Sequence, residues 1–477
     1  MIPPLPELAL ALVLAAPAIG AVGAAGSRGR WPERIALGAA AVAWGAATTL
    51  LVLHPTGQWG GYFGIDPVSD LFLFTVASIY ALATVHSREY LRHAPSPRLA
   101  PSPYYGLLGA FAGAMILTLS VTDLGLMWVG LEATTVASAL LIALEHRPAG
   151  VEAAWRYTVI ASAGLALALL GLIVLDGATG TLDVVRLGAH PVAVSRAVAL
   201  AVGLALVGFG TKVGLFPMHT WLPDAHSEAP APISALLSGV LLPTALYVFL
   251  RLYAVLAAPV PGALADLVVL FGLGTAVVAA LLSLDQRSPK RLLAYSSMEV
   301  MGVAVVGVGL GGIALYGALF LVVAHAFAKT SAFLTTGRVL QRTGGVGLDR
   351  LRDLRRRLPF TSGTWWIGAA AVTGAPPFGT FVGELLILSG AIAAGALAVA
   401  AVLVGALAVA FLGVNFQIGR AVVASEVGNG APREADPLWG LLVPWIGLGV
   451  TLLLGLAAIP FLSPLLRAAA AALGGTP

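Results

Sequence analysis

Five ionisable side chains lie in the middle of apolar runs of this sequence. Three are acidic and two are basic, and each occupies a separate hydrophobic stretch: Glu132, Lys212, Glu299, Lys329 and Glu384. A charge at the centre of a membrane helix costs about 2.5–3.5 kcal/mol on insertion scales, so it is rarely kept without a partner or a polar cavity. One such residue alone would fit a structural ion pair or a side chain that extends to the membrane surface. A row of five favours a proton relay, because burial allows a lysine to release its proton near neutral pH.

A histidine accompanies the second lysine. His325 and Lys329 are four residues apart, so they share one face of a helix. Such a pair is able to pass a proton between an imidazole and an amine. Taken alone, His325 fits an ordinary packed core histidine better. Its place beside Lys329 is what makes it a candidate member of the relay.

Prolines interrupt two of the hydrophobic stretches. Proline removes a backbone donor and clashes with the preceding turn, and freed backbone groups at membrane depth are tolerated where they face protein or a water-lined cavity. Broken helices at matching positions of two halves indicate an ion or substrate pathway in transporters. The interruptions are FPMHTWLPDAHSEAPAP, residues 216–232, and GAPPFGTF, residues 374–381. We therefore expect helix breaks at Pro217, Pro223, Pro230, Pro376 and Pro377.

The first interruption also contains two histidines and two acids, namely His219, Asp224, His226 and Glu228. Imidazole and carboxylate groups are common metal ligands, so a metal site is one interpretation. Because these residues follow a helix break near the predicted membrane surface, helix capping and backbone satisfaction explain them better. We therefore expect no metal site. Asp285 and Lys290 are interpreted in the same way, as a structural loop pair.

The composition indicates the setting of these residues. Of the 477 residues, 59% are hydrophobic and 10% are charged (26 Lys+Arg and 22 Asp+Glu), whereas a soluble domain carries about 25% charged residues. With a mean hydropathy of +0.94, the chain is predicted to be an all-α polytopic membrane protein. It has no Cys, which excludes disulfides, thiolate zinc sites and cysteine-ligated iron–sulfur clusters. We expect no cofactor in this chain, and any iron–sulfur or nickel–iron centre to belong to partner subunits.

Apolar blocks long enough to cross a bilayer, about 20 residues each, are found fourteen times. The first block has no positively charged start and no clear cleavage site, so it is interpreted as a retained span. The seventh and twelfth blocks contain the proline breaks. The predicted spans are 6–26, 35–53, 66–85, 105–122, 123–144, 153–175, 197–216, 229–250, 263–284, 292–311, 313–337, 361–390, 393–419 and 437–463.

Corresponding features recur five spans apart. Glu132 and Glu299 lie in the fifth and tenth spans, and the two breaks lie in the seventh and twelfth. Spans 4–8 and 9–13 are therefore predicted to be two five-helix repeats, and because five is odd the second copy is inverted. The resulting segments are an N-terminal three-helix segment, the two repeats, and a C-terminal helix with a tail: residues 1–104, 105–250, 251–420 and 421–477.

The basic residues are distributed unevenly between the loops. Loops after odd-numbered spans hold 20 of the 26 Lys and Arg residues, the opposite loops hold four, and two lie inside spans. By the positive-inside rule, the richer loops are cytoplasmic and both termini lie on the non-cytoplasmic side of the cell membrane. The net charge of +4 then reflects topology and indicates no nucleic-acid partner. The richer loops contain Arg28, Arg30, Arg34, Arg88, Arg92, Arg98, Arg147, Arg156, Arg287, Lys290, Arg291, Arg338, Arg342, Arg350, Arg352, Arg355, Arg356, Arg357, Arg420 and Arg433.

Four segments resemble the antiporter-like subunits of respiratory complex I, of membrane-bound hydrogenases and of multi-subunit cation/proton antiporters. The most characteristic is KVGLFPMHTWLPDAHSEAPAPISALLSG, residues 212–239. The others follow in the family's order and, with the first, cover most of spans five to twelve: KRLLAYSSMEVMG (290–302), HAFAKTSAFLTTG (325–337) and APPFGTFVGELLIL (375–388). The resemblance implies fourteen helices, two inverted repeats and a chain of buried polar residues at mid-membrane height.

The resemblance also implies roles for the buried residues. Glu132 matches the family's fifth-helix glutamate, and Lys212 matches its lysine partner on the broken seventh helix. Opening or closing this ion pair is expected to load or release a proton. His325 and Lys329 match the polar pair of the eleventh helix. Glu384 matches the exit-side residue of the broken twelfth helix, which is glutamate in some members and lysine in others.

Two positions depart from the family's pattern. Several members carry a further lysine in the eighth helix where this chain has Pro243, so water, Ser234 or Ser238 would bridge the half-channels here. Many complex I members have serine–serine–x–x–histidine in the tenth helix, where this chain has Glu299 followed by Val300. The glutamate at this position resembles the hydrogenase-type, formate hydrogenlyase-like subunits.

The leading hypothesis is a proton-translocating membrane subunit of a redox-driven complex, bound to other membrane subunits and a peripheral redox arm. Whether the chain forms part of an enzyme then depends on those partners. One alternative is a subunit of a secondary Na⁺/H⁺ antiporter without a redox partner. Another is an energy-coupling membrane subunit for a cytoplasmic partner such as an inorganic-carbon transporter. A non-conducting scaffold also fits the changes at Pro243 and Val300.

Overall fold

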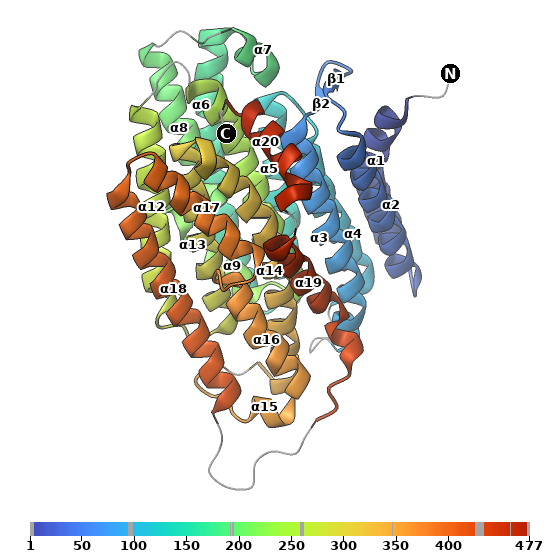
Figure 1. Cartoon of the computed structure of the whole chain (residues 1–477). Helices are drawn as coiled ribbons and strands as arrows, with labels where there is room; N and C mark the ends of the chain where they lie inside the picture. Colours follow the sequence, from blue (N-terminus) through green and yellow to red (C-terminus); the bar gives the residue numbers. More distant parts are fainter. Residues whose placement is uncertain are drawn as a thin grey trace.

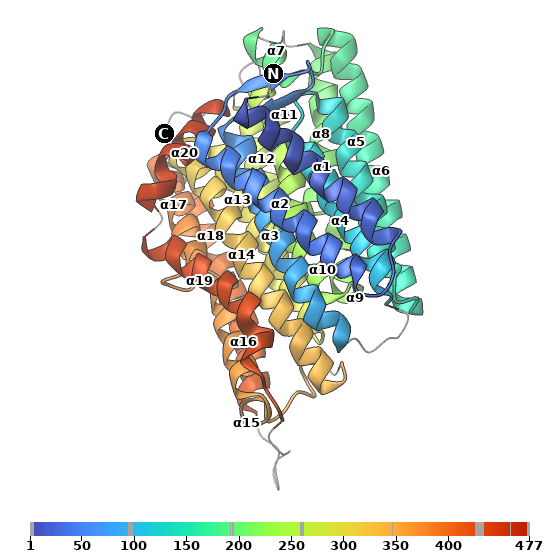
Figure 2. The same cartoon turned by 90° about the vertical axis from the view of Figure 1, so that its right-hand side faces the viewer.

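The computed structural model describes residues 4–93, 99–190, 192, 195–257, 262–345, 347–424, 434–457 and 459–474. Long helices run side by side through one bundle (Figure 1), and the strands found in these residues form one small antiparallel hairpin. Two arginines of the predicted cytoplasmic loops, Arg98 and Arg433, lie outside the described residues. Figure 2 shows that α15 lies at one end of the bundle and α7 at the other, with the start of α1 and α20 toward the α7 end. We call the α15 end the Arg-rich end.

The first half of the chain contains three leading helices, the hairpin, and the helices of the predicted first repeat. The bounds are α1 Leu5–Ala25, α2 Trp31–Leu53, β1 Gly57–Trp59, β2 Phe63–Ile65, α3 Pro67–Arg92, α4 Pro101–Leu119, α5 Leu124–Ala143, α6 Pro148–Thr179, α7 Val184–Ala189, α8 Arg196–Val213, α9 Trp221–Glu228, α10 Ala231–Leu236 and α11 Leu242–Ala257. A 3₁₀ turn, Met218–Thr220, precedes α9, and a π-helical turn, Leu237–Leu241, joins α10 to α11.

The second half contains the helices of the predicted second repeat and the C-terminal helices. The bounds are α12 Ala263–Ser283, α13 Pro289–Leu310, α14 Gly312–Thr343, α15 Leu354–Arg357, α16 Pro359–Val372, α17 Gly379–Ala393, α18 Leu397–Val423, α19 Leu442–Leu456 and α20 Ile459–Ala472. Within the described residues, thirteen helical segments are long and apolar enough to cross a membrane. The twelfth predicted span is present as the shorter helices α16 and α17. The predicted all-α fold with broken seventh and twelfth spans is therefore confirmed.

The last predicted span, 437–463, is wrong at its C-terminal end. Helix α19 ends at Leu456, and the separate helix α20 begins at Ile459. Proline at position 460 has no backbone N–H and cannot continue the hydrogen-bond ladder of α19, whereas it is tolerated in the first turn of a new helix. The hairpin and the short helix α7 were also not expected, because they lie in polar connectors without a clear periodic pattern.

The break of the seventh span begins at a glycine in the left-handed region. Gly214 has φ +87°, which most side chains avoid, and it directly follows the end of α8. The N–H of Leu215 then donates to the Gly210 carbonyl at 2.9 Å. After the break, Trp221 Nε1 donates to the Thr211 carbonyl at 2.8 Å. Carbonyls freed by the end of α8 are thus satisfied by the chain that follows it.

The break of the twelfth span is built in the same way. Gly374 has φ +68°, and the N–H of Ala375 donates to the Ala370 carbonyl at 3.0 Å. The Thr380 hydroxyl donates to the Ala371 carbonyl at 2.6 Å, in the manner of Trp221 in the first break. This likeness supports the predicted correspondence of the seventh and twelfth spans.

The predicted helix-breaking prolines occupy different places. Pro217 lies between α8 and α9, and Pro376 and Pro377 lie between α16 and α17. Pro230 directly precedes α10. Pro223 lies in the first turn of α9, where a missing N–H leaves no intrahelical acceptor unsatisfied.

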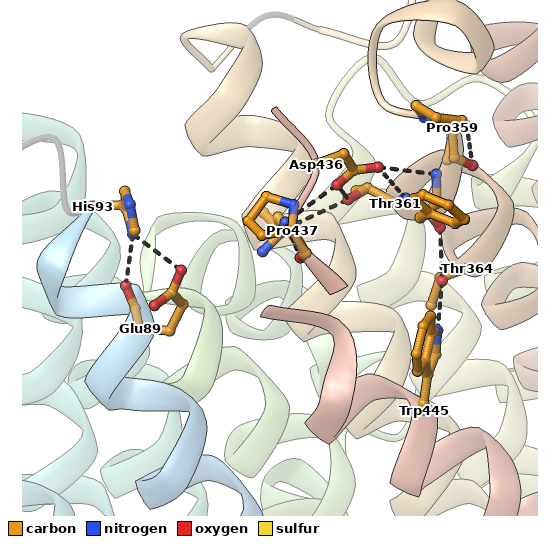
Figure 3. A network of polar contacts seen from close by, with 11 residues as sticks. Glu89, His93, Pro359, Thr361, Thr364, Asp436, Pro437 and Trp445 are labelled. Atoms are coloured by element: carbon orange, nitrogen blue, oxygen red, sulfur yellow. Dashed lines mark hydrogen bonds and ion pairs between the residues drawn. The ribbon is translucent and has the colours of Figure 1, made fainter. Parts of the chain in front are cut away.

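A buried ion pair fixes the Arg-rich end of α14 to α16 and to the segment before α19 (Figure 3). Asp436 accepts hydrogen bonds from the backbone N–H groups of Phe360 and Thr361, both at 2.9 Å, at the first turn of α16. Arg338 of α14 donates to the same carboxylate at 3.2 Å and to the Pro437 carbonyl at 2.8 Å. Burial raises the pKa of Asp436, but the bonds from Thr361 and Arg338 outweigh it and lower the pKa below its ordinary value.

Candidate functional site

The first cluster of buried polar groups surrounds Lys212, which lies at the end of α8 and is fully buried. Its ammonium donates to the Thr135 hydroxyl at 2.7 Å and to the Tyr157 hydroxyl at 2.5 Å. It also lies over two aromatic rings, 4.6 Å from the centre of Tyr157 and 5.9 Å from that of Trp221. These contacts stabilise a cation without placing a second full charge beside it.

Glu132 lies on α5, and the residue is partly exposed, although its Oε2 atom is buried. Its Oε1 accepts a 2.6 Å hydrogen bond from Ser162 of α6, and its Oε2 has no partner among the described residues. Lys212 interacts with Glu132 electrostatically, but within the described chain the two form no ion pair at 4.0 Å or less. Thr135, which holds the ammonium, is one turn from Glu132 on α5. The predicted pair is therefore adjacent but open.

The second cluster surrounds Lys329 of α14, which is also fully buried. Its ammonium donates to the Leu293 carbonyl at 2.9 Å and to the Ser296 hydroxyl, both on α13. Glu299 is one turn beyond Ser296 on the same helix, is 1% exposed, and interacts electrostatically with Lys329. As in the first cluster, a hydroxyl group accepts a hydrogen bond from the amine and the carboxylate lies one turn from that hydroxyl, but here a backbone carbonyl is the second acceptor.

Glu384 of α17 adds a second carboxyl group to this cluster. It is 5% exposed, and its Oε1 has no partner among the described residues. The side chain folds back against the break, so that a Cβ at Gly374 would overlap its carboxyl group. Glu384 also interacts electrostatically with Glu299. Gly374 therefore provides both the left-handed turn and the space for this carboxyl group.

His325 lies one turn before Lys329, and its Nε2 is 3.2 Å from the Ser238 carbonyl. This carbonyl is free because of Pro243. In a regular α-helix the Leu242 N–H would donate to Ser238, but here it donates to Leu237, and Pro243 has no N–H to replace it. A carbonyl only accepts, so the His325 Nε2 carries the proton and its Nδ1 is left as the basic nitrogen.

Two serines bridge the same region. The Ser238 and Ser297 hydroxyls are 2.7 Å apart and join the π-helical turn to α13. Ser234, the other serine expected near the gap left by the missing lysine, donates to the His226 carbonyl at 2.8 Å. Ser238 thus lies directly beside His325, whereas Ser234 supports the chain around His226.

His226 was expected near the surface, and that expectation is wrong. The side chain is fully buried, and neither ring nitrogen has a hydrogen-bond partner of ordinary geometry among the described residues; its weak backbone contact is with Leu222. Its ring packs 6.5 Å from that of Trp221 and 5.7 Å from that of Phe333. Because Trp221 also contacts Lys212, and His226 interacts electrostatically with Lys329, this histidine lies between the two clusters.

The other polar residues of the first break have separate surroundings. His219 is 8% exposed, while Asp224 and Glu228 form ion pairs with arginines toward the Arg-rich end. The described part of the chain contains no group of three or more side chains suited to a metal ion. Lys290, expected to pair with Asp285, is instead buried and donates to the Ala229 carbonyl at 2.6 Å.

The six predicted residues therefore form a row across the bundle. Figure 2 shows α5 and α17, which carry Glu132 and Glu384, on opposite sides with α13 and α14 between them. Such a row of amines, carboxyl groups and imidazoles can pass a proton in short steps. His226 belongs to the row, but no local pattern marks it, because its neighbours Asp224, Ser227 and Glu228 are polar.

Comparisons with known proteins agree on the family. Residues 121–410 match the model of the family described as NADH:quinone oxidoreductase/Mrp antiporter, TM. A hydrogenase-4 component F homolog of Methylacidiphilum infernorum is 34% identical over 72% of this chain and 76% of its own length. An NADH-quinone oxidoreductase subunit N of Desulforudis audaxviator is 34% identical over 70% of this chain and 68% of its own length. A chain of the Mrp complex from a Dietzia species shares the fold, with a TM-score of 0.89 at 22% identity over 98% of this chain and 97% of that one.

Proposed function

The chain belongs to the NADH:quinone oxidoreductase/Mrp antiporter transmembrane family, and from this premise we propose that it is the proton-translocating membrane subunit of a redox-driven complex. The observation that carries the proposal is the row of ionisable side chains from α5 to α17, which would be too costly in a membrane without a function. It is an antiporter-like membrane subunit in which Lys212 and Lys329 are the exchanging amines.

Loading and release are proposed to start at Lys212. The ammonium is held by neutral hydroxyls and aromatic faces, with the Glu132 carboxylate beyond ion-pair distance. Closing the pair would favour the charged amine, and opening it would favour release of the proton. Because Glu132 is partly exposed on α5, a partner subunit that contacts this side can shift the balance.

From Lys212 the proton is proposed to move along the row. His226 would receive it between the clusters, and Lys329 would follow. Glu299 and Glu384 then provide carboxyl groups toward the twelfth-span break. His325, with its basic Nδ1, lies one turn from Lys329 and supports the transfer there. Each step transfers one proton from a donor to an acceptor, so no group of this chain is oxidised or reduced.

The electrons are assigned to other subunits. The absence of Cys leaves no ligands for a cysteine-bound cluster, so iron–sulfur or nickel–iron centres would belong to a peripheral arm. A relative named as a hydrogenase-4 component F homolog and the glutamate at position 299 both favour a hydrogenase-type complex. A Na⁺/H⁺ antiporter without a redox arm, or energy coupling to a cytoplasmic carrier, would use the same row.

The Arg-rich end is proposed to face the cytoplasm of a cell with this protein in its plasma membrane. The positive-inside rule supports this orientation, because 20 of the 26 basic residues lie in the loops after odd-numbered spans. Both termini would then be non-cytoplasmic. Reaction of a single introduced cysteine with an impermeant reagent would report the orientation directly, since the native chain has no Cys.

The central test is Lys212→Ala in vesicles that contain the native complex. We expect proton pumping to fall about a hundredfold or more, with normal assembly, because the amine that exchanges the proton is gone. Lys212→Arg is the matched control: it keeps the charge but cannot release a proton, so it should fail equally. Normal pumping by Lys212→Ala would refute the proposal. Purifying the complex and analysing it for iron and nickel separates a redox complex from an antiporter.

A further inference from the structure

The carboxyl group of Glu132 has an unused hydrogen-bonding atom. Its Oε1 accepts a 2.6 Å hydrogen bond from the Ser162 hydroxyl of α6, and its Oε2 is buried without a partner among the described residues. A length of 2.6 Å is typical of a hydroxyl that donates to an ionised carboxylate, which is one of the stronger hydrogen bonds in proteins. Ser162 therefore holds this carboxylate in the open position, beyond ion-pair distance from Lys212.

The Lys212 ammonium has an unused donor. An ammonium carries three N–H groups, and two of them donate to the hydroxyls of Thr135 and Tyr157. The third can bind a carboxylate without the loss of either hydroxyl contact. The pair of Glu132 and Lys212 can therefore close when the carboxylate leaves Ser162, while the contacts that hold the amine stay in place.

Hydrogen bonds on both sides of Glu132 fix α5 to α6. The Trp128 indole N–H, one turn before Glu132 on α5, donates to the Leu165 carbonyl of α6 at 2.6 Å. Beyond Glu132 on α5, the Ser138 hydroxyl is 2.8 Å from the Tyr157 hydroxyl of α6. Sliding of α5 along α6 would break both contacts, so the two backbones are held in one position around Glu132.

The backbones of α6 and α8 approach each other closely near the same residues. A Cβ at Gly164 of α6 would lie 2.5 Å from the Cβ of Thr211, the residue before Lys212 on α8. A Cβ at Gly208 of α8 would lie 2.4 Å from the backbone nitrogen of Ala168 on α6. Small residues permit such close approach, and close-packed helices resist displacement because their atoms would overlap. The backbones of α6 and α8 are therefore also fixed to each other.

We propose that the Glu132 side chain is a switch that moves between Ser162 and Lys212 while α5, α6 and α8 stay in place, and that Ser162 is the positioning residue of its open state. The inference rests on the proposed function. In the closed state the carboxylate accepts the third N–H of Lys212, and the Ser162 hydroxyl turns to the Thr158 carbonyl, four residues earlier on α6, a contact common for serines in helices. The switch itself breaks and forms hydrogen bonds only.

The groups that face Lys212 explain why the position of Glu132 matters. The titratable ones are Glu132 from α5 and Tyr157 from α6, and α9 contributes the ring of Trp221. A tyrosine ordinarily ionises only near about pH 10, so at neutral pH the negative charge beside the amine is that of the carboxylate. Loss of the Ser162 hydroxyl would move the carboxylate toward Lys212 and favour the charged amine over release of its proton.

Ser162→Ala in native complexes in vesicles tests the switch. We expect proton pumping at neutral pH to fall about tenfold, because a hydrogen bond to a charged group is strong enough to shift the open–closed equilibrium by this factor. Since a retained proton is released more readily at higher pH, the pH of half-maximal pumping should rise by about one unit. Ser162→Thr keeps the hydroxyl and should pump like wild type. Thr158→Ala removes another hydroxyl of α6, which donates to the Ala154 carbonyl at 2.8 Å, and should leave pumping unchanged.

Three results would overturn the proposal. They are wild-type pumping by Ser162→Ala at every pH, a loss in Ser162→Ala that higher pH does not relieve, and an equal loss in Ser162→Thr, which would show that the hydroxyl is not what matters. Lys212→Ala, measured in parallel, separates this proposal from the proposed function. If Lys212→Ala pumps normally, the proposed function fails and the switch falls with it. If it does not pump while Ser162→Ala pumps like wild type, the switch alone is wrong.

Discussion

The two clusters of buried charge use the same contacts in different surroundings. In each, a lysine donates to a hydroxyl group of a neighbouring helix, and a glutamate lies one turn from that hydroxyl: Thr135 near Glu132, and Ser296 near Glu299. Around the first cluster, 50% of the apolar stretch of α5, 39% of that of α6 and 72% of that of the α8–α9 span, which carries Lys212, are buried. Around the second, 94% of the apolar stretch of α13 and 89% of that of α14 are buried.

This difference indicates a division of work. Glu132 is partly exposed on α5, whereas Glu299 is 1% exposed on α13, so the first cluster lies closer to the surface of this chain. The second cluster is enclosed and can respond only through groups inside the chain. It also has a different charge balance, because Glu299 and Glu384 share one Lys329. Two ionised carboxylates beside one ammonium would leave an unpaired buried charge, so we expect the second cluster to retain a proton.

The largest expected effect tests whether the clusters act in series. Lys329→Met should lower proton pumping about a hundredfold or more, as Lys212→Ala does, because each amine is a required step. The variant with both substitutions should be no worse than either alone, as expected for groups that work as a unit. The measurement is pumping in vesicles at matched levels of assembled complex. If one single variant still pumps substantially and the double variant does not pump, the two clusters lie on parallel routes. The conclusion that they act in series would then be wrong.

A smaller effect should distinguish the two helix breaks. Gly374→Ala and Gly214→Ala both place a side chain at positive φ, so each should destabilise the fold by roughly 1–3 kcal/mol. The new methyl group at position 374 would also overlap the Glu384 carboxyl, whereas at position 214 it meets the flexible end of the Leu222 side chain. We therefore expect about a tenfold loss of pumping in Gly374→Ala alone. Thermal unfolding and pumping are measured on the same preparations, and equal pumping by both would remove the special role of Gly374.

A more modest effect is expected at Pro243. Pro243→Ala restores a backbone N–H and so allows the π-helical turn to become a regular helix, in which the Leu242 N–H donates to the Ser238 carbonyl. His325 would then lose its acceptor. We expect pumping to fall a few-fold, because the loss of the hydrogen bond that positions His325 costs on the order of 1 kcal/mol. The free energy of unfolding should stay unchanged or rise. Ser238→Ala is the control, since it removes the hydroxyl and keeps the carbonyl. If the control fails and Pro243→Ala pumps normally, the bridge to Ser297 matters and the carbonyl does not.

The sequence alone identified these residues where a charged side chain interrupts an apolar run. Glu132, Lys212 and Glu384 are visible because a charge inside an apolar run has few explanations, and the span count follows from the same contrast. The prediction that His226 lies near the surface was wrong, because its burial depends on how α9 packs against other helices after the break. Such tertiary packing leaves no local sequence pattern. Pro243 was visible as a departure, but the carbonyl that it frees can be recognised only with α14 beside it.

The open state of the first pair was also beyond prediction from sequence. Residue types favour an ion pair between Glu132 and Lys212, yet Thr135, Tyr157 and Ser162 compete for the same groups at 2.5–2.7 Å. Which contact wins depends on the positions of three helices to within fractions of an ångström. Spacing along one chain does not contain that information. The comparison of the clusters therefore rests on geometry, although its members were identifiable from the sequence.

The smallest expected effect on pumping comes from a buried ion pair outside both clusters. Asp436 has a lowered folded-state pKa, so it contributes stability at pH values above its unfolded pKa of about 3.9 and loses that contribution as the pH falls through the folded value. Asp436→Asn should destabilise the fold by about 1–3 kcal/mol at pH 7, with the difference from wild type narrowing below about pH 4.

Pumping by the assembled Asp436→Asn complex should be unchanged, because the Arg338–Asp436 pair fixes the end of α14 without entering the row. The matched control is Glu434→Gln, whose pair with Arg357 is more exposed and should contribute about 0–1 kcal/mol. Both comparisons are made by thermal unfolding across pH alongside pumping at neutral pH. A large loss of pumping in Asp436→Asn would mean that burial of charge alone, and not membership in the row, determines which residues this protein needs for proton transfer.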